Sequence, residues 1–279
     1  MMIVVTGGNG RIGRFVVRAL LEKGHGVRTV DRVLVPDPDC PQMLVDLTDL
    51  GQVFGAVKGA DAVLHLAAIP DPGGHPDEVV FGNNVLATFN VVQAAEALGI
   101  RRVAWASSIC AAGVPYHPPR TAPLYLPLDE EHPLLPPDCY GLSKLVGEEI
   151  CRAASRRSPL TSVSLRFSLV TYPEDYERLT GRSPDGERPD VANLWTYSDI
   201  RDVAHACELA LTVPLDGHHA FFIVAPDTLS ETPTPELLSR HFPEVRWVGS
   251  GPQPAQAPVT CARAERDLGW QARHGWRPR

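Results

Sequence analysis

A tyrosine and a lysine four residues apart form the pair in this sequence that is best suited to acid–base chemistry. Tyr140 and Lys144 belong to the stretch Tyr-Gly-Leu-Ser-Lys, and a spacing of four residues places both side chains on one face of a helix. An ammonium group beside a phenol stabilises the phenolate, which lowers the phenol pKa from its ordinary value near ~10 and makes it a useful general base. We therefore predict that Tyr140 and Lys144 are catalytic.

Two consecutive serines are the second candidate for chemistry. Ser107 and Ser108 follow a short apolar run at residues 103–106, which is typical of a buried strand. In open α/β sheets, ligands bind beyond the carboxyl ends of the strands, so a hydroxyl at this place can hold a substrate oxygen. We expect one of the two serines to do this and the other to cap the strand.

A glycine-rich turn near the N-terminus is suited to binding a pyrophosphate. Gly7, Gly10 and Gly13 lie between a predicted strand at residues 3–6 and a predicted helix at residues 11–23. Glycines permit a tight turn in which backbone N–H groups approach the phosphates, and the helix N-terminus adds partial positive charge. The sequence thus predicts a dinucleotide-binding site.

An acid at the end of the second predicted strand indicates which dinucleotide is bound. Asp31 stands 18 residues after Gly13, near the ~20 residues expected for the carboxylate that accepts hydrogen bonds from an adenosine ribose. A carboxylate also repels a 2′-phosphate, which favours NAD over NADP. Arg32 keeps NADP as the alternative, because an arginine can pair with that phosphate.

Strands and helices alternate over the first two thirds of the chain, which indicates an α/β fold with a Rossmann-type, doubly wound parallel sheet. We expect an NAD-binding domain over residues 1–168 and a small mixed substrate-binding region over residues 169–279. The proline-rich stretch 115–137 is predicted to form a semi-rigid lid over the site, with a surface insertion or a dimer contact as the alternative. The other expected strands are residues 27–30, 43–45, 62–66, 103–106, 162–166 and 220–224, and the other expected helices are residues 50–57, 77–98, 138–156, 198–211, 235–240 and 262–268.

The composition is that of an ordinary globular protein and excludes several classes of function. The 279 residues carry 33 acidic and 26 basic side chains, a formal net charge of −7, and no block of Lys or Arg, so we expect no nucleic-acid partner. The six cysteines are scattered and read as reduced thiols, and the ten histidines show no metal-ligand spacing, so no metal is expected. No apolar run reaches the ~20 residues of a membrane helix, and no signal peptide is evident, so we expect a cytoplasmic protein.

Together these motifs resemble the extended short-chain dehydrogenase/reductases of the NAD-dependent epimerase/dehydratase type. The resemblance extends over essentially the whole chain and is strongest over residues 1–170. The stretches that carry it are TGGNGRIG (6–13), Asp31, Asp46-Leu47, HLAA (65–68), NVLAT (84–88), SSICAAG (107–113), YGLSK (140–144) and SLRFSLVTYP (164–173), with YSDIRDVA (197–204) and DLGW (267–270) as weaker matches.

The resemblance implies a role for each matched position. Tyr140 is implied as the catalytic base, Lys144 as the residue that holds the nicotinamide ribose, and Ser108 as the active hydroxyl residue. The acidic pair that 4,6-dehydratases carry directly after that residue is replaced by Ile109 and Cys110, which disfavours dehydration. The implied cofactor-binding residues are Gly7, Gly10, Arg11, Ile12, Gly13, Asp31, Arg32, Asp46, Leu47, Leu66, Ala67, Ala68, Asn84, Ser107, Tyr140 and Lys144.

The implied activity is NAD-dependent oxidation of a secondary alcohol of a sugar or nucleotide sugar. Family prevalence favours a UDP-sugar 4-epimerase type, and the alternative is an NAD-dependent sugar or uronate dehydrogenase, which residues 171–176 and 194–199 faintly resemble. A non-catalytic NAD-sensing regulator is disfavoured because the serine, tyrosine and lysine are all retained. The candidate substrate contacts are Ser108, Arg166, Tyr172, Tyr197 and Arg201.

The resemblance also implies a homodimer. In this family the helices near residues 84–98 and 140–156 commonly pair across the dimer. The apolar residues compatible with such an interface are Val85, Phe89, Val92, Leu145 and Ile150, although each of them would fit equally well against the sheet.

Overall fold

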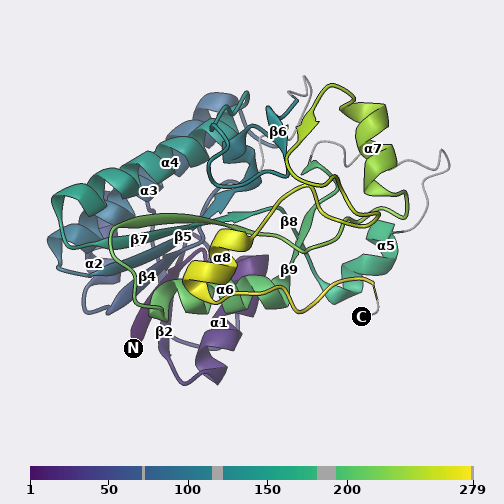
Figure 1. The fold of residues 1–279 in the computed structure, drawn as a ribbon. Helices are drawn as coiled ribbons and strands as arrows, with labels where there is room; N and C mark the ends of the chain where they lie inside the picture. The colour runs from purple at the N-terminus through teal and green to yellow at the C-terminus, as the bar shows by residue number, and fades with distance from the viewer. Residues whose placement is uncertain (71–72, 115–121, 181–192, 278–279) are drawn as a thin grey trace.

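The computed structural model of the protein has a parallel β-sheet at its centre (Figure 1). It describes residues 1–70, 73–114, 122–180 and 193–277. Seven strands pair in the order β10-β7-β5-β4-β1-β2-β3, and each neighbouring pair is parallel, which confirms the predicted α/β class. These strands are β1 (Met2–Thr6), β2 (Gly26–Asp31), β3 (Gln42–Leu44), β4 (Ala62–His65), β5 (Arg102–Ser108), β7 (Thr161–Phe167) and β10 (His218–Ile223).

The strand order reverses between β1 and β4, and this reversal determines where a ligand fits. From β1 the chain adds β2 and β3 on one side, and from β4 it adds β5, β7 and β10 on the other. At such a switch point the connections leave the sheet in opposite directions, which opens a crevice at the carboxyl ends of the two strands. The glycine turn follows β1 directly, so the fold brings it to the edge of that crevice.

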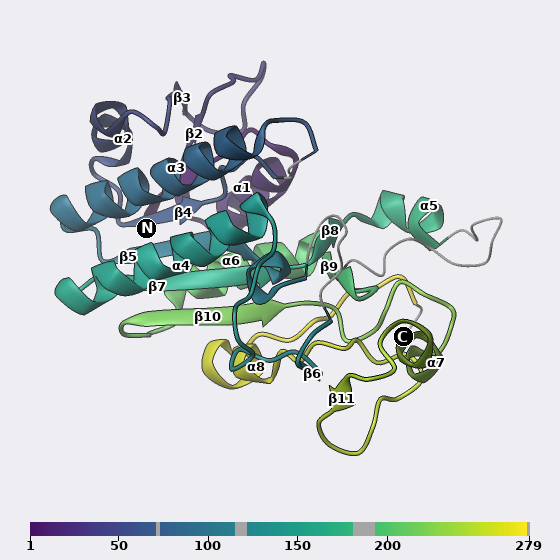
Figure 2. The ribbon, with the colours of Figure 1, turned by 90° about the horizontal axis from the view of Figure 1, so that it is seen from above.

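Helices cover both faces of the sheet, as Figures 1 and 2 show. Alternate side chains of a strand point to opposite faces, so Ile3 and Val5 pack into one core cluster and Val4 into the other. Since both faces are buried, the strands read as continuous apolar runs. The helices on the Val4 side are α2 (Leu50–Val57), α3 (Asp77–Ala97) and α4 (Cys139–Arg157), and those on the opposite side are α1 (Arg11–Glu22), α6 (Ile200–Thr212) and α8 (Ala262–Leu268).

Local signals set the ends of the helices that carry site residues. Asp138 caps α4 by accepting a hydrogen bond from the backbone N–H of Gly141 at 2.7 Å. Beyond the end of α3, Gly99 adopts the left-handed conformation with φ +71°, which an L side chain rarely adopts. The predicted boundaries of both helices are therefore confirmed to within a residue or so.

Of the several short elements beyond the carboxyl ends of the strands, the helix α7 was expected at residues 235–240, and the others were not expected from the sequence. Figure 2 shows α5, α7, β6 and β11 gathered at that end of the sheet. β6 pairs with β11, and β8 pairs with β9. These elements are β6 (Tyr125–Leu126), β8 (Leu169–Thr171), α5 (Tyr176–Thr180), β9 (Tyr197–Asp199), α7 (Thr234–His241) and β11 (Arg246–Trp247), with single 3-10 turns η1 (Ile109–Ala112) and η2 (Pro173–Asp175).

The central sheet extends past residue 168, the expected domain boundary. β10 and the crossover helix α6 both come from residues beyond 168 and complete the sheet beside β7. A right-handed crossover needs a helix between two parallel strands, and α6 provides the one between β7 and β10. The boundary expected at residue 168 lies before the end of the sheet, because the long irregular segment between β7 and α6 interrupts the alternation of strands and helices in the sequence.

The proline-rich segment is attached to the C-terminal part of the chain. Its residues 115–121 lie outside the described residues. Within residues 122–137, Leu128 is fully buried and exchanges backbone hydrogen bonds with the segment 258–260, and the Glu130 carboxylate accepts from the backbone N–H of Phe222 at 2.9 Å. Residues 122–137 are thus fixed to β10 and its neighbours.

Two further findings on the described residues concern membrane helices and disulfides. None of the described helices combines the length and the apolar character that crossing a membrane requires. The six cysteines are all unpaired.

Candidate active site

The glycine turn between β1 and α1 has no room for side chains. Gly7 has φ +68°, and a Cβ there would lie 2.6 Å from the backbone nitrogen of Ala67. A Cβ on Gly13 would lie 2.1 Å from the carbonyl oxygen of Gly7. The turn therefore leaves its backbone exposed to a ligand rather than covering it with side chains, as a pyrophosphate cradle requires.

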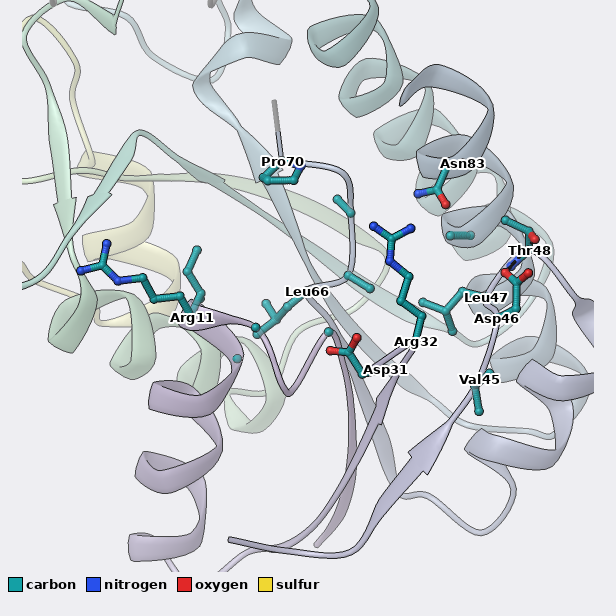
Figure 3. Close-up of a pocket in the computed structure, with 17 residues that line it drawn as sticks. Arg11, Asp31, Arg32, Val45, Asp46, Leu47, Thr48, Leu66, Pro70 and Asn83 are labelled. Carbon is teal, nitrogen blue, oxygen red and sulfur yellow. Dashed lines mark hydrogen bonds between the residues drawn. The ribbon is translucent and has the colours of Figure 1, made fainter. Parts of the chain in front are cut away.

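A pocket of about 570 Å³ opens at the switch point of the sheet. Figure 3 shows its lining residues converging from the turn after β1, the ends of β2 and β3, and the loop after β4. The volume and the narrow glycine floor suit a dinucleotide. The predicted cofactor residues that line it are Gly7, Gly10, Arg11, Ile12, Gly13, Asp31, Arg32, Asp46, Leu47, Leu66, Ala67 and Ala68; Val45, Thr48, Pro70, Asn83 and Ala87 line it as well.

One end of this pocket carries both signs of charge. The Asp31 carboxylate accepts hydrogen bonds from the backbone N–H groups of Asn9 at 3.1 Å and Val33 at 3.3 Å. Hydrogen bonds from Thr48 lower the pKa of Asp46 below its ordinary value. Arg32 extends into the pocket between them and Asn83 (Figure 3). Both acids are thus present as hydrogen-bond acceptors for hydroxyl groups.

At the other end of the pocket, Arg11 points toward the C-terminal region (Figure 3). Its guanidinium lies 2.7 Å from the Asp175 carboxylate and 3.8 Å from the centroid of the Tyr172 ring. Tyr172 is itself buried beneath this contact. The first turn of α1 is thereby linked to the segment that follows β8.

Tyr140 and Lys144 lie side by side on the face of α4 that is turned toward the sheet. The tyrosine is 7% and the lysine 4% exposed. The Lys144 ammonium donates to the carbonyl oxygen of Ala106 at 2.6 Å and lies 5.4 Å from the centroid of the Tyr140 ring. Burial lowers the pKa of Lys144 to about 8. The predicted pairing of phenol and ammonium is therefore present.

The two serines at the end of β5 have different partners. The Ser108 hydroxyl accepts a hydrogen bond from the backbone N–H of Cys110 at 3.1 Å and begins the turn η1. The Ser107 hydroxyl donates to the Glu148 carboxylate of α4 at 2.7 Å. Ser107 thus contacts α4, whereas the hydrogen bond of the Ser108 side chain is local, from the turn that follows it.

The serine, tyrosine and lysine do not line the main pocket but lie one strand away from its edge. The pocket ends at the loop after β4, and β4 pairs directly with β5. Asn84 connects the two places, because its amide bonds the backbone of Ile69 at 2.8 and 3.0 Å and the Ser143 hydroxyl at 3.4 Å. Asn84 is consequently buried behind the pocket wall, and Asn83 occupies the wall itself.

A buried histidine beneath the glycine turn was not identified from the sequence. His65 bonds the Thr6 hydroxyl at 2.6 Å and the Thr88 hydroxyl at 3.2 Å. Burial, with a smaller contribution from Lys144, lowers the pKa of His65 to about 3. The neutral imidazole therefore joins the end of β1 to α3. In the sequence His65 is only the first residue of the HLAA stretch, and nothing there indicates its partners Thr6 and Thr88.

The remaining candidate substrate contacts lie in structural networks. Arg166 is 2% exposed and pairs with Glu148. Tyr197 is fully buried and donates to Asp227 at 2.7 Å. Arg201 makes a two-point contact with Asp199 at 2.7 and 2.9 Å. Each of these side chains is engaged by a carboxylate of the protein itself, so we do not propose them as substrate contacts.

Comparison with known proteins places these observations in context. The family model described as NAD dependent epimerase/dehydratase family matches residues 3–223. A relative named putative UDP-glucose 4-epimerase from Methanocaldococcus jannaschii is 33% identical over 61% of this chain and 56% of its own length, so the match spans little more than half of that protein. A relative named uronate dehydrogenase from Pseudomonas syringae pv. tomato is 29% identical over 80% of this chain and 74% of its own. The crystal structure of a short-chain dehydrogenase/reductase superfamily protein from Agrobacterium tumefaciens, with bound NAD, is 26% identical with a TM-score of 0.76 and covers 99% of this chain and 94% of that one.

The substitution Gly13→Ala tests the close packing of the glycine turn. Because the new Cβ meets backbone atoms that cannot move aside, we expect a loss of about 1–3 kcal/mol in the free energy of unfolding, measured by urea denaturation. Gly55→Ala in α2 is the matched control, since a Cβ there meets nothing within 4 Å and alanine is expected to stabilise the helix by about 0.5–1 kcal/mol. Equal stability of Gly13→Ala and the parent protein would contradict the packing.

The buried neutral state of His65 predicts a specific loss of stability in acid. Its pKa is about 3 in the folded protein and ~6.5 when unfolded, so its contribution is complete above pH 6.5 and is lost as the pH falls toward 3. Between pH 7 and pH 5 this amounts to about 2 kcal/mol. We expect His65→Gln to lack this part of the pH dependence in urea denaturation. The partly exposed His219→Gln serves as control and should retain it.

Proposed function

The chain belongs to the NAD dependent epimerase/dehydratase family, and from this premise we propose that it is an enzyme that binds NAD and oxidises a secondary alcohol of a sugar-like substrate. The proposal depends chiefly on one observation. The Lys144 ammonium is buried beside the Tyr140 ring and donates to Ala106 of β5, the strand that ends at Ser108. A phenol, an ammonium and a hydroxyl at this place are the groups that moving a proton from an alcohol requires.

The residues of the main pocket fit a dinucleotide. The glycine turn, in which a Cβ would collide with backbone atoms at Gly7 and Gly13, would hold the pyrophosphate at the N-terminus of α1. Asp31 would accept hydrogen bonds from the adenosine ribose, which favours NAD over NADP. Asp46 and Leu47 would flank the adenine, and Lys144 would hold the nicotinamide ribose. NAD, when bound, supplies the acceptor for the hydride that leaves the alcohol carbon.

The protein's own residues would place the substrate and remove its proton. Ser108 would hold the reacting oxygen by a hydrogen bond, and Tyr140, as phenolate, would take the hydroxyl proton. The neighbouring ammonium of Lys144 favours the phenolate over the phenol. Since Lys144 is fixed to the Ala106 carbonyl, this charge is in place before the substrate arrives and needs no rearrangement during the reaction.

A nucleotide-sugar epimerase is the leading form of the activity. In that case the ketone stays bound, turns over and takes the hydride back on its other face, so that cofactor is neither consumed nor released. The relative named UDP-glucose 4-epimerase supports this form. A sugar or uronate dehydrogenase is the second candidate, in which the ketone or lactone leaves and NADH accumulates. It is supported by the relative named uronate dehydrogenase, whose match covers 80% of this chain.

The two forms are separated by one assay with NAD present. We expect an epimerase to interconvert UDP-glucose and UDP-galactose without net absorbance of NADH, and a dehydrogenase to form NADH from glucuronate, galacturonate or a free hexose. In either case Tyr140→Phe should lower the rate by roughly 10²–10⁴-fold, because the general base is lost.

Tyr125→Phe is the matched control for this substitution. The Tyr125 hydroxyl donates to Asp129 within the same loop, so this variant should retain the rate. A protein that binds NAD but turns over none of these sugars, and whose NAD affinity is the same with phenylalanine at position 140, would contradict the enzyme proposal and favour an NAD-sensing regulator.

We also propose that the protein is a homodimer formed through the outer faces of α3 and α4. These helices pack side by side on one face of the sheet (Figure 1). Val79, Leu86 and Phe89 of α3 and Leu142 of α4 are each exposed by about two fifths, and exposed large apolar residues on neighbouring helices are typical of an interface. Of the residues first considered for this role, Val92 lies in the core against the sheet instead.

Substitution of the most central exposed aromatic tests this interface. Phe89→Glu places a charge on the proposed contact, and we expect the molar mass measured by light scattering to fall from that of two chains to that of one. Leu124→Glu is the control, because Leu124 is exposed on a loop away from α3. A parent protein that is monomeric at micromolar concentration would rule the interface out.

A further inference from the structure

Helix α4 meets the end of β5 at three successive points. Lys144 donates to the Ala106 carbonyl at 2.6 Å. At Gly147 a Cβ would lie only 2.4 Å from the ring of Trp105, so the helix lies directly on that side chain. One residue further, Glu148 accepts a hydrogen bond from Ser107 at 2.7 Å. Lys144 and Glu148 are four residues apart and therefore lie on one face of the helix. The position of Lys144 relative to β5 thus depends on the contacts that Gly147 and Glu148 make with that strand.

Glu148 also forms a buried ion pair. Its carboxylate accepts two hydrogen bonds from the Arg166 guanidinium, at 2.9 and 2.7 Å, and the two side chains are 0% and 2% exposed. Arg166 lies on β7 directly opposite Ser107. One carboxylate thus joins α4, β5 and β7. Removing two charges from water is costly unless the pair is well hydrogen-bonded. Three hydrogen bonds reach the Glu148 carboxylate, whereas Nη1 of Arg166 is buried without a partner among the described residues.

We propose that Glu148 is a positioning residue of the active site: it holds α4 in register with β5, so that Lys144, Tyr140 and Ser108 keep their relative places, and it balances the charge of Arg166 beneath Lys144. The catalytic meaning of this assignment rests on the proposed function. The balancing of the Arg166 charge by Glu148 does not rest on the proposed function, because it concerns the titration of Lys144 in the protein without cofactor or substrate.

The charge balance follows from the groups that face Lys144 and the ion pair. His65 of β4 and Cys110 of η1 face Lys144, and both are uncharged at neutral pH, because burial displaces their pKa values to about 3 and about 12. Tyr140 faces it from the same helix. The groups that interact with the ion pair are His218 of β10, with a pKa lowered by burial to about 4, and Glu130 and His132 of the segment 122–137. Glu148 lies one helical turn from Lys144 on the same face of α4, so the opposite charges of the intact pair act on Lys144 in opposite directions.

Breaking the pair from either side should move the Lys144 titration in opposite directions. Because the chain has three lysines, Lys23, Lys58 and Lys144, carbon-13 label at the lysine ε-carbon gives three NMR signals to follow against pH. Glu148→Gln leaves the Arg166 charge uncompensated, and we expect the Lys144 midpoint to fall by about one pH unit. Arg166→Gln leaves the carboxylate, and the midpoint should rise. The double variant carries neither charge and should return close to the parent value.

The signals of Lys23 and Lys58 provide the internal control, since both side chains are exposed to solvent at the ends of α1 and α2 and should not move. A Lys144 midpoint that is unchanged in both single variants, while thermal unfolding shows them folded, would overturn the proposal. If the role of the pair were purely structural, Glu148→Gln and Arg166→Gln would lower the stability of the protein without shifting the Lys144 midpoint in opposite directions.

Ser107→Ala tests whether Glu148 holds α4 in register with β5. This variant leaves the ion pair of Glu148 and Arg166 in place, so it remains informative if Glu148→Gln does not fold. It removes the contact of α4 with β5 at Glu148, and we expect the turnover rate to fall by about 3–10-fold. The matched control is Ser162→Ala, which removes an equally buried hydroxyl that contacts the Cys151 carbonyl of the same helix, further from Lys144. It should lose similar stability and retain the rate.

Equal rates for the two serine variants would overturn the positioning role. If the parent protein turns over no sugar, the proposed function fails. The Lys144 titration still shows whether Glu148 balances the charge of Arg166. The two failures are therefore distinguishable.

Discussion

The burial of one ammonium group is the constraint on which the rest of the active site depends. A lysine that is 4% exposed must recover the hydrogen bonds that it loses on leaving water, and Lys144 does so with the Ala106 carbonyl. That contact requires α4 to lie close to β5, which Gly147 allows by leaving room for the Trp105 ring. The cost of burial is visible in the lowered pKa of Lys144. Burial makes the ammonium costly to hold, but it also strengthens the effect of the ammonium on the Tyr140 phenol, because a charge interacts more strongly in a medium of low polarity.

The dinucleotide pocket and the catalytic group are joined through β4. This strand ends at His65, whose neutral ring ties Thr6 of β1 to Thr88 of α3. The chain then lines the pocket at residues 66–68 and reaches Ile69, which is held by Asn84. Asn84 in turn contacts Ser143 of α4. Each of these polar groups is buried and hydrogen-bonded, so the distance between the glycine turn and Lys144 is set by directional contacts rather than by apolar packing alone.

Much of the fold and the pocket could be predicted from the sequence, because the relevant signals are local. A strand buried on both faces shows as an apolar run, a glycine turn shows as a spacing, and an acidic cap such as Asp138 stands directly before its helix. The elements that were missed depend on distant partners. β6 has two residues and exists because β11 pairs with it. The strand β10 was expected at residues 220–224, but its place in the central sheet was not, because a long irregular segment separates it from β7. Glu148 and His65 were missed for the same reason. A carboxylate in a helix and a histidine in a strand become informative only when their partners on other strands are known.

The residues that follow Ser108 limit what the site can do after the first oxidation. Eliminating water from the ketone would need an acid and a base beside the serine, and these positions hold Ile109 and Cys110. Both belong to η1, whose four residues are buried, and burial raises the pKa of the Cys110 thiol to about 12, so that it gives up no proton near neutral pH. The same apolar turn surrounds the buried Lys144 with groups that do not compete for its charge. The proposed base Tyr140 therefore has no second proton carrier beside it in η1, which agrees with the proposed exchange of one proton and one hydride at this end of β5.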